Sequence, residues 1–262
     1  MFLACGGGSA VFVLGVGLLC VALRRLEALA RTPMLDVILS LLTWIPWLVS
    51  YLAGGWAGLA GCVVGQFVAL YGWCFVHELM HPVAKNGPRI VKFIDRHVGR
   101  WRNHLALWAT LVVLPVFWLI RLATATIYWP LVWLLKFPKY RQAEWINVSR
   151  QKFDGLVGHD LVWCLYCDWM TGVYSLGAEM LRNVESFWCP IRYYDGKKCD
   201  NCKLDFPDID NGWVKADGNM ADVDQLMQDK YGQGQHAWFG HPVRLTRDGK
   251  PLVPSPGNPG EG

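Results

Sequence analysis

The residues in this chain that are best suited to chemistry are His77, Glu78 and His81, which form an H-E-x-x-H sequence at the end of a long apolar run. On a helix, residues four positions apart share a face, so the imidazoles of His77 and His81 could bind one metal ion. The carboxylate of Glu78, the residue directly after His77, could then act on a metal-bound water. This spacing indicates a zinc site with hydrolytic chemistry.

The same five residues resemble the H-E-x-x-H motif of zincin-type metalloproteases, including membrane-embedded ones. The resemblance implies that His77 and His81 bind zinc and that Glu78 is the general base. A third ligand would come from or near a helix expected over 170–187. The candidates are Glu179, Glu185 and Asp168. The chain departs from the motif at Pro82, because a proline disfavours helical geometry at the residue before it.

Two other interpretations of this segment stay open. It also resembles the first histidine box of membrane alkane hydroxylases and desaturases, with His97 and His104 following, which would imply a di-iron site. That family needs further H-x-x-H-H boxes, whereas this chain has seven His and no adjacent pair. The third interpretation has no metal at all: His77, Glu78 and His81 are then polar residues that end a membrane helix at the water interface.

A second group of possible ligands lies towards the C-terminus, where five of the nine cysteines fall within 40 positions of one another. They are Cys164, Cys167, Cys189, Cys199 and Cys202. Two C-x-x-C pairs can supply four thiolates to a structural zinc or to an iron–sulfur cluster. The alternatives are two disulfides and a spare thiol, which would require an oxidising compartment, or unpaired structural thiols.

The elements that must position these residues are strongly apolar. Runs over 8–23, 34–53 and 56–80 each approach the ~20 residues that are needed to cross a lipid bilayer. A further apolar block at 105–137 contains Arg121, whose charge is costly inside a membrane. We therefore expect this block to form a hairpin with Arg121 near its turn, or one tilted and kinked span.

Small residues recur one helical turn apart around the start of the third run. Gly54 and Gly58 form one such pair, and Gly61 and Gly65 form another. This spacing lets two helices in lipid approach closely. It predicts close helix packing on these glycine faces, through which we expect the chain to bind a protein partner, although the first pair could equally belong to a turn.

The net charge of +4 is unevenly distributed, because residues 85–102 hold six basic residues and one acid. Beside apolar spans, such a run is typical of a cytoplasmic loop in contact with anionic lipid headgroups, and not of nucleic-acid binding. It predicts an integral membrane protein with the H-E-x-x-H segment and the C-terminal domain on the cytoplasmic side. A single span through 105–137 would put that domain outside.

The sequence thus predicts an all-α polytopic membrane protein. The expected parts are a membrane domain over 1–137, a Cys-rich extramembrane domain over 138–253 and a disordered tail over 254–262. Residues 203–253 have few apolar clusters and are expected to bind a protein partner. Two functions remain: a zinc-dependent hydrolase or peptidase at the membrane edge, or a non-catalytic subunit or assembly factor of a membrane complex with a Cys-ligated metal.

Overall fold

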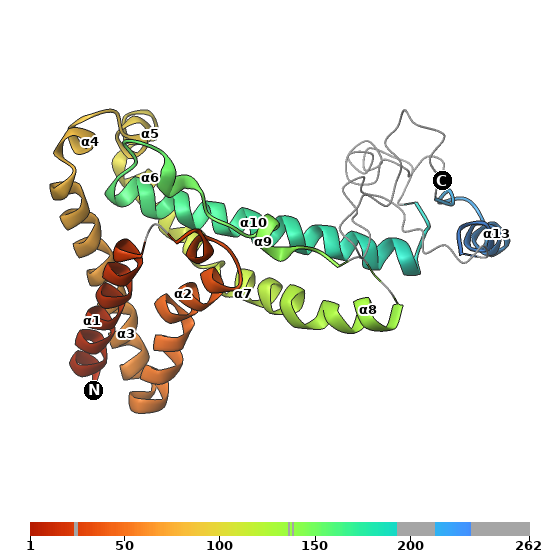
Figure 1. The fold of residues 1–262 in the computed structure, drawn as a ribbon, viewed down its shortest axis with the longest axis horizontal. Coiled ribbons are helices and arrows are strands. Elements are labelled where there is room, and N and C mark those ends of the chain that lie inside the picture. The colour runs from red at the N-terminus through yellow and green to blue at the C-terminus, as the bar shows by residue number, and fades with distance from the viewer. Residues whose placement is uncertain (24–25, 136, 138, 193–212, 232–262) are drawn as a thin grey trace. The chain divides into compact units, whose positions relative to one another are not determined.

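The computed structural model in Figure 1 describes residues 1–23, 26–135, 137, 139–192 and 213–231. Every regular element in this described part is helical. Its β-type contacts are two isolated bridges, one between Arg31 and Asn147 and one between Ile191 and Val214. The predicted all-α architecture is therefore confirmed for these residues.

The first apolar run forms one helix, α1 (Phe2–Ala22), which packs along α3 (Trp44–Met80). The contact depends on small residues, because a Cβ atom on Gly61 or on Gly65 would overlap a backbone carbonyl oxygen of α1. Two helices can approach this closely only where no side chain stands between them. The Gly61/Gly65 face is therefore occupied by a helix of the same chain.

The second and third apolar runs are joined by a fold-back inside α3. The backbone leaves helical geometry at Gly54 and Gly55, and Gly55 has a φ of +57°, which glycine adopts at little cost. Trp47, before the break, donates a hydrogen bond to the side-chain oxygen of Gln66, after it, at 2.6 Å. The amide of Gln66 also donates to carbonyl groups at the end of α2 (Met34–Leu42). These contacts bring the two predicted runs side by side.

The apolar block that contains Arg121 forms a nearly continuous helical path. Its elements are α6 (Arg100–Leu111), α7 (Leu114–Leu122), the five-residue π-helical turn η2 (Ala123–Ile127) and α8 (Tyr128–Leu135). Arg121 lies inside α7, so the hairpin with its turn at this residue is wrong, and the kinked single path is what forms. The Arg121 guanidinium is buried and donates to the Thr124 hydroxyl, one turn further along, at 3.1 Å.

Among the described residues, three helical stretches are long and apolar enough to cross a membrane: Phe2–Ala22, Met34–Met80 and Arg100–Leu135. The second is 47 residues long and includes the fold-back, so it exceeds the ~20 residues of one span. Large apolar side chains remain exposed along all three stretches. An apolar surface of this extent is typical of helices that face lipid or a partner.

The remaining helices connect and extend these stretches. They are η1 (Glu27–Ala30), α4 (Pro82–Asn86), α5 (Ile90–Val98), α9 (Gln142–Trp145), η3 (Arg150–Lys152), α10 (Gly158–Trp188) and α13 (Met220–Tyr231). Two compact units divide the chain: Met1–Pro115 with Gln142–Gly172, and Val116–Arg141 with Val173–Gly262. Helix α10 belongs to both units, and the expected domain boundary at 137 falls inside the second.

Much of the expected Cys-rich domain, and all of the expected tail, lies outside the described residues. The ranges concerned are 193–212 and 232–262. Within the expected partner-binding region 203–253, the structure describes residues 213–231, which include α13. Pairing between the two C-x-x-C sequences therefore stays a prediction.

Candidate functional site at the H-E-x-x-H segment

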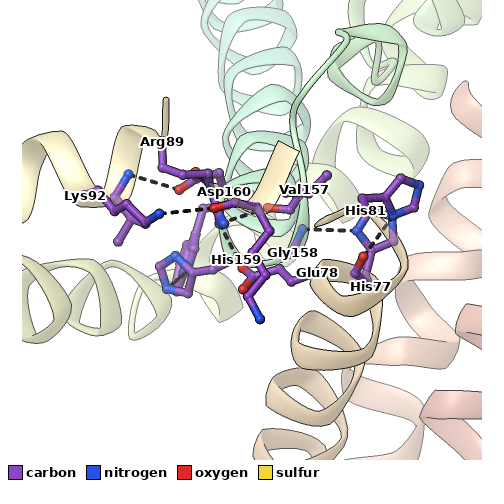
Figure 2. Close-up of polar contacts among 12 residues, drawn as sticks. His77, Glu78, His81, Arg89, Lys92, Val157, Gly158, His159 and Asp160 are labelled. Carbon is purple, nitrogen blue, oxygen red and sulfur yellow. Dashed lines mark hydrogen bonds and ion pairs between the residues drawn. The ribbon is translucent and has the colours of Figure 1, made fainter. Parts of the chain in front are cut away.

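The side chains of the H-E-x-x-H segment, at the end of α3, contact the beginning of α10 (Figure 2). The Gly158 N–H donates to Nδ1 of His77 at 3.2 Å. The His159 N–H donates to the carboxylate of Glu78. The first N–H groups of a helix have no acceptor within that helix, so His77 and Glu78 cap α10 from another helix. The negative carboxylate also complements the positive end of the α10 dipole.

Arg89 links Glu78 to Asp160, a residue in the first turn of α10. Its Nη2 donates to Oε1 of Glu78 at 2.8 Å and to the Val157 carbonyl at 3.2 Å, and its Nε donates to Oδ2 of Asp160 at 2.6 Å. The side chains of Arg89 and Asp160 are 4% and 5% exposed, so each charge depends on the other for compensation. Burial alone would lower the pKa of Arg89, but its bonds to Asp160 and Glu78 raise it.

Asp160 also caps α5. Its Oδ1 accepts a hydrogen bond from the Val91 N–H, in the first turn of that helix, at 3.1 Å. Arg89 is the residue directly before α5. One set of side chains therefore joins the end of α3 to the beginnings of α5 and α10. We call His77, Glu78, Arg89, Gly158 and Asp160 the helix-end cluster.

Gly158 is required at its position for two separate reasons. Its φ of +54° lies in the left-handed region that favours glycine. A Cβ atom here would also overlap the carboxylate of Glu78. The close approach between Glu78 and the first turn of α10 is therefore possible only with this residue.

The two histidines of the motif are stacked on each other, with ring centroids 4.4 Å apart and an interplanar angle of 29°. Nδ1 of His77 accepts from Gly158, and Nδ1 of His81 lies 2.9 Å from the His77 carbonyl oxygen. The effect expected of Pro82 is confirmed, because α3 ends at Met80 and His81 has non-helical φ and ψ of −124° and 63°. The regular helical geometry of a zincin site is thus lost at the second histidine.

The candidates for a third ligand serve other contacts. Asp168 accepts from the Ser149 N–H at 2.8 Å and forms an ion pair with Arg150. Glu179 belongs to the second unit, where it is fully buried and accepts from the Tyr140 hydroxyl at 3.0 Å. Across the part of the chain that the structure describes, no group of three or more His, Cys, Asp or Glu side chains is placed to hold a metal ion. The zinc site at His77 and His81 therefore stays a prediction.

Glu179 is part of a buried polar network that the sequence did not indicate. Its side chain pairs with Arg182 at 3.7 Å, and Asn183 donates to the same Tyr140 hydroxyl that donates to Glu179. Asn183 is fully buried, and its position four residues after Glu179 places both on one face of α10. The third candidate, Glu185, is partly buried, which raises the pKa of its carboxyl.

The cysteines divide between described and undescribed residues. Cys164 and Cys167 lie in the part of α10 that belongs to the first unit, and Cys189 follows the end of α10 in the second unit. Burial raises the pKa of the Cys164 thiol. The seven cysteines that the structure describes include no disulfide. Cys199 and Cys202 lie outside the described residues, so the thiolate site also stays a prediction.

Sequence reasoning missed Arg89, Gly158 and Asp160 as members of this site. In the sequence Arg89 is one of six basic residues over 85–102, and nothing distinguishes it from its exposed neighbours. A glycine two positions before an aspartate is a usable signal for a helix start, because acidic residues favour the first turn. That signal predicts the start of α10, but not which side chains meet it.

Comparisons of the chain with family models, with curated proteins and with solved structures find no match. The resemblance to zincins therefore rests on five residues. The function has to be argued from the geometry of the site and from the apolar surface.

Proposed function

We propose that this chain is a non-catalytic helical subunit or assembly factor of a membrane complex, in which the H-E-x-x-H segment is a structural joint. The observation that carries the proposal is the ion pair between Glu78 and the buried Arg89, at 2.8 Å. Together with Asp160, this pair holds three helix ends in one arrangement. The rival function, a zinc-dependent hydrolase, needs the same carboxylate for another task.

A general base must accept a proton from a metal-bound water during the reaction. The carboxylate of Glu78 instead faces a guanidinium and the N-terminus of α10, and both stabilise the carboxylate as an anion. Removing Glu78 from this position would also leave Arg89 and Asp160 without part of their buried network. The position of Glu78 thus supports a structural role.

The membrane part of the proposal is supported by the three apolar stretches and by the side chains that they expose. Lipid does not distinguish between apolar helices, so specific contact in a membrane comes from close packing and polar groups. The chain uses its Gly61/Gly65 face internally, against α1. A partner would therefore bind other surfaces, among which the expected region 203–253 stays a prediction.

Glu78→Gln separates the two functions. The substitution keeps the shape of the side chain but removes the charge that faces Arg89. As a structural joint, the site should lose thermal stability in detergent while the bound metal is unchanged. The matched control is Glu27→Gln, because Glu27 forms an exposed ion pair with Lys152 at 3.0 Å and should change stability little.

The hydrolase would behave in the opposite way. Zinc would be bound to the purified chain and lost in both His77→Ala and His81→Ala, and Glu78→Gln would keep the metal and the stability. Membership of a complex is tested separately by the size of the chain after mild solubilisation from its own membranes. A species of one 29.6 kDa chain would contradict the proposal.

A further inference from the structure

Helix α5 carries an apolar face that stays about half exposed. The side chains on this face are Ile90, Phe93, Ile94 and Val98. Their spacing of three and four places them on one side of the helix. Each is between 36% and 55% exposed. A short helix in water gains nothing from this arrangement, so the face needs an apolar surface against it.

Two contacts outside the apolar face attach α5 to the rest of the first unit. The Val91 N–H is bound to Asp160, and Asp95 accepts from the Asn103 side chain of α6 at 2.8 Å. Both contacts belong to the first unit. Helix α5 is therefore attached to the helix-end cluster and to α6.

Basic side chains lie on the polar side of α5 and at the start of α6. Lys92 and Arg96 lie on α5, and Arg100 and Arg102 begin α6; all four are exposed. Lys92 donates to the Lys85 carbonyl at 3.1 Å. Within the described ranges, Arg96, Arg100 and Arg102 form no ion pair with a carboxylate, so their charges are available to an anionic surface.

The position of α5 along the chain indicates that this anionic surface is a lipid bilayer. The helix lies in the connection between two stretches that could cross a membrane, Met34–Met80 and Arg100–Leu135. When these two stretches cross the membrane, both ends of the connection that contains α5 lie at the bilayer surface. Trp101, which is 85% exposed, directly follows the start of α6, and exposed tryptophan is typical of the headgroup region.

We infer that α5 lies in the surface of an anionic lipid bilayer. Its apolar face enters the boundary between headgroups and acyl chains, and Lys92, Arg96 and Arg100 bind the phosphates of anionic lipid headgroups. The inference rests on the proposed function in one respect: the chain must be an integral membrane protein. Lipid is favoured over an acidic protein as the occupant because α5 connects two candidate membrane spans, so a bilayer surface is close to this face without a second protein.

The test uses the full chain in nanodiscs that contain phosphatidylcholine, with or without phosphatidylglycerol. Native mass spectrometry then measures which lipids stay bound when the nanodisc is removed. The expected result is enrichment of phosphatidylglycerol, and its loss in the triple variant Lys92→Gln/Arg96→Gln/Arg100→Gln. One cation at an anionic surface contributes about fivefold, so the triple variant should lose roughly 100-fold of the preference.

The matched control removes the same charge elsewhere, by Arg31→Gln/Arg150→Gln/Lys152→Gln. These three residues are paired with acids, Glu27 for two of them and Asp168 for Arg150. The control should keep the enrichment. Equal loss in both triple variants, or no enrichment in the parent chain, would overturn the inference; the latter is also the outcome expected if an acidic protein is the true partner.

The apolar face is tested by amide hydrogen exchange over residues 92–98 in nanodiscs. Phe93→Ser/Ile94→Ser should increase the exchange rate there severalfold, and unchanged rates would contradict insertion of this face. Extraction of the membranes with alkaline carbonate distinguishes the two failures. If the chain resists extraction but shows no lipid preference, only this inference is contradicted. If the chain is extracted, the integral-membrane part of the proposed function is contradicted.

Discussion

Nε of Arg89 lies 2.6 Å from Oδ2 of Asp160, although 71 positions separate the two residues in the sequence. This pair is nearly inaccessible to water, and Glu78 adds a second carboxylate on the same guanidinium. The three residues join α3, α5 and α10, so the end of an apolar helix is tied to the beginning of a long polar-faced one.

Arg89→Gln should be strongly destabilising. It leaves Asp160 buried without its positive partner, and the cost of breaking such a pair is about 3–5 kcal/mol. Chemical unfolding in detergent measures this. Arg150→Gln is the control, because Arg150 pairs with Asp168 while half exposed, and surface pairs contribute roughly 0–1 kcal/mol. Similar losses in the two variants would contradict a structural role for the cluster.

Gly158→Ala should destabilise more than Gly155→Ala. Both glycines have positive φ, +54° and +81°, so both substitutions carry the left-handed cost of about 1–2 kcal/mol. At Gly155 a Cβ atom meets nothing within 4 Å, whereas at Gly158 it overlaps Glu78. Overpacking adds about 1–3 kcal/mol at the second site only. The difference in free energy of unfolding measures the contact, and equal values would show that Glu78 can move away freely.

Stability should fall as the pH is lowered below about 6.5, the ordinary pKa of histidine. Burial and the nearby His104 lower the pKa of His159, and Trp163 donates to its Nε2 at 2.9 Å, which favours the neutral ring. The unfolded chain therefore takes up this proton first, so the stability is fully present above the unfolded pKa and is lost as the pH falls towards the folded pKa.

His159→Gln should reduce this acid sensitivity, and Trp163→Phe should change it in the same direction because the donor to the ring is gone. Thermal unfolding between pH 5 and pH 8 measures the slope. An unchanged slope in His159→Gln would assign the acid sensitivity to other groups.

Tyr140→Phe should cost about 1–3 kcal/mol, because Glu179 and Asn183 each lose a hydrogen-bond partner in a buried site. Tyr174→Phe is the matched control, since Tyr174 is 62% exposed on α10, the helix that carries Glu179 and Asn183. Its effect on the free energy of unfolding should be much smaller. The free energy of unfolding in detergent decides between them. Equal effects would mean that the network around Glu179 is not important for stability.

Metal analysis addresses the two predicted metal sites separately. We expect a single metal per chain at most, lost in Cys199→Ser and kept in His77→Ala, because the described residues leave His77 and His81 without a third ligand. Elemental analysis of the purified protein measures this. If the metal is lost in His77→Ala but kept in Cys199→Ser, the result would contradict this prediction and support the zinc-dependent hydrolase.

The apolar runs, their approximate ends and the break at Gly54–Gly55 follow from the sequence alone. Apolar length and glycine position are local properties, and the membrane or the helix packing does not change them. The effect of Pro82 on His81 was equally local and equally predictable. The close packing at Gly61 and Gly65 could also be expected, although not that α1 is the partner.

The tertiary structure decided what the polar residues do. The sequence around Glu78 is compatible with a zinc site and with a structural joint between helices. What distinguishes the two roles is that Arg89 and the first turn of α10 contact the Glu78 carboxylate in the folded chain. The position of Arg121 was also decided by folding, since it is buried inside α7 and not at a turn. The sequence determines which side chains carry a charge. The free energy of burying that charge depends on the oppositely charged group that compensates it, and only folding brings a distant group such as Arg89 to Asp160.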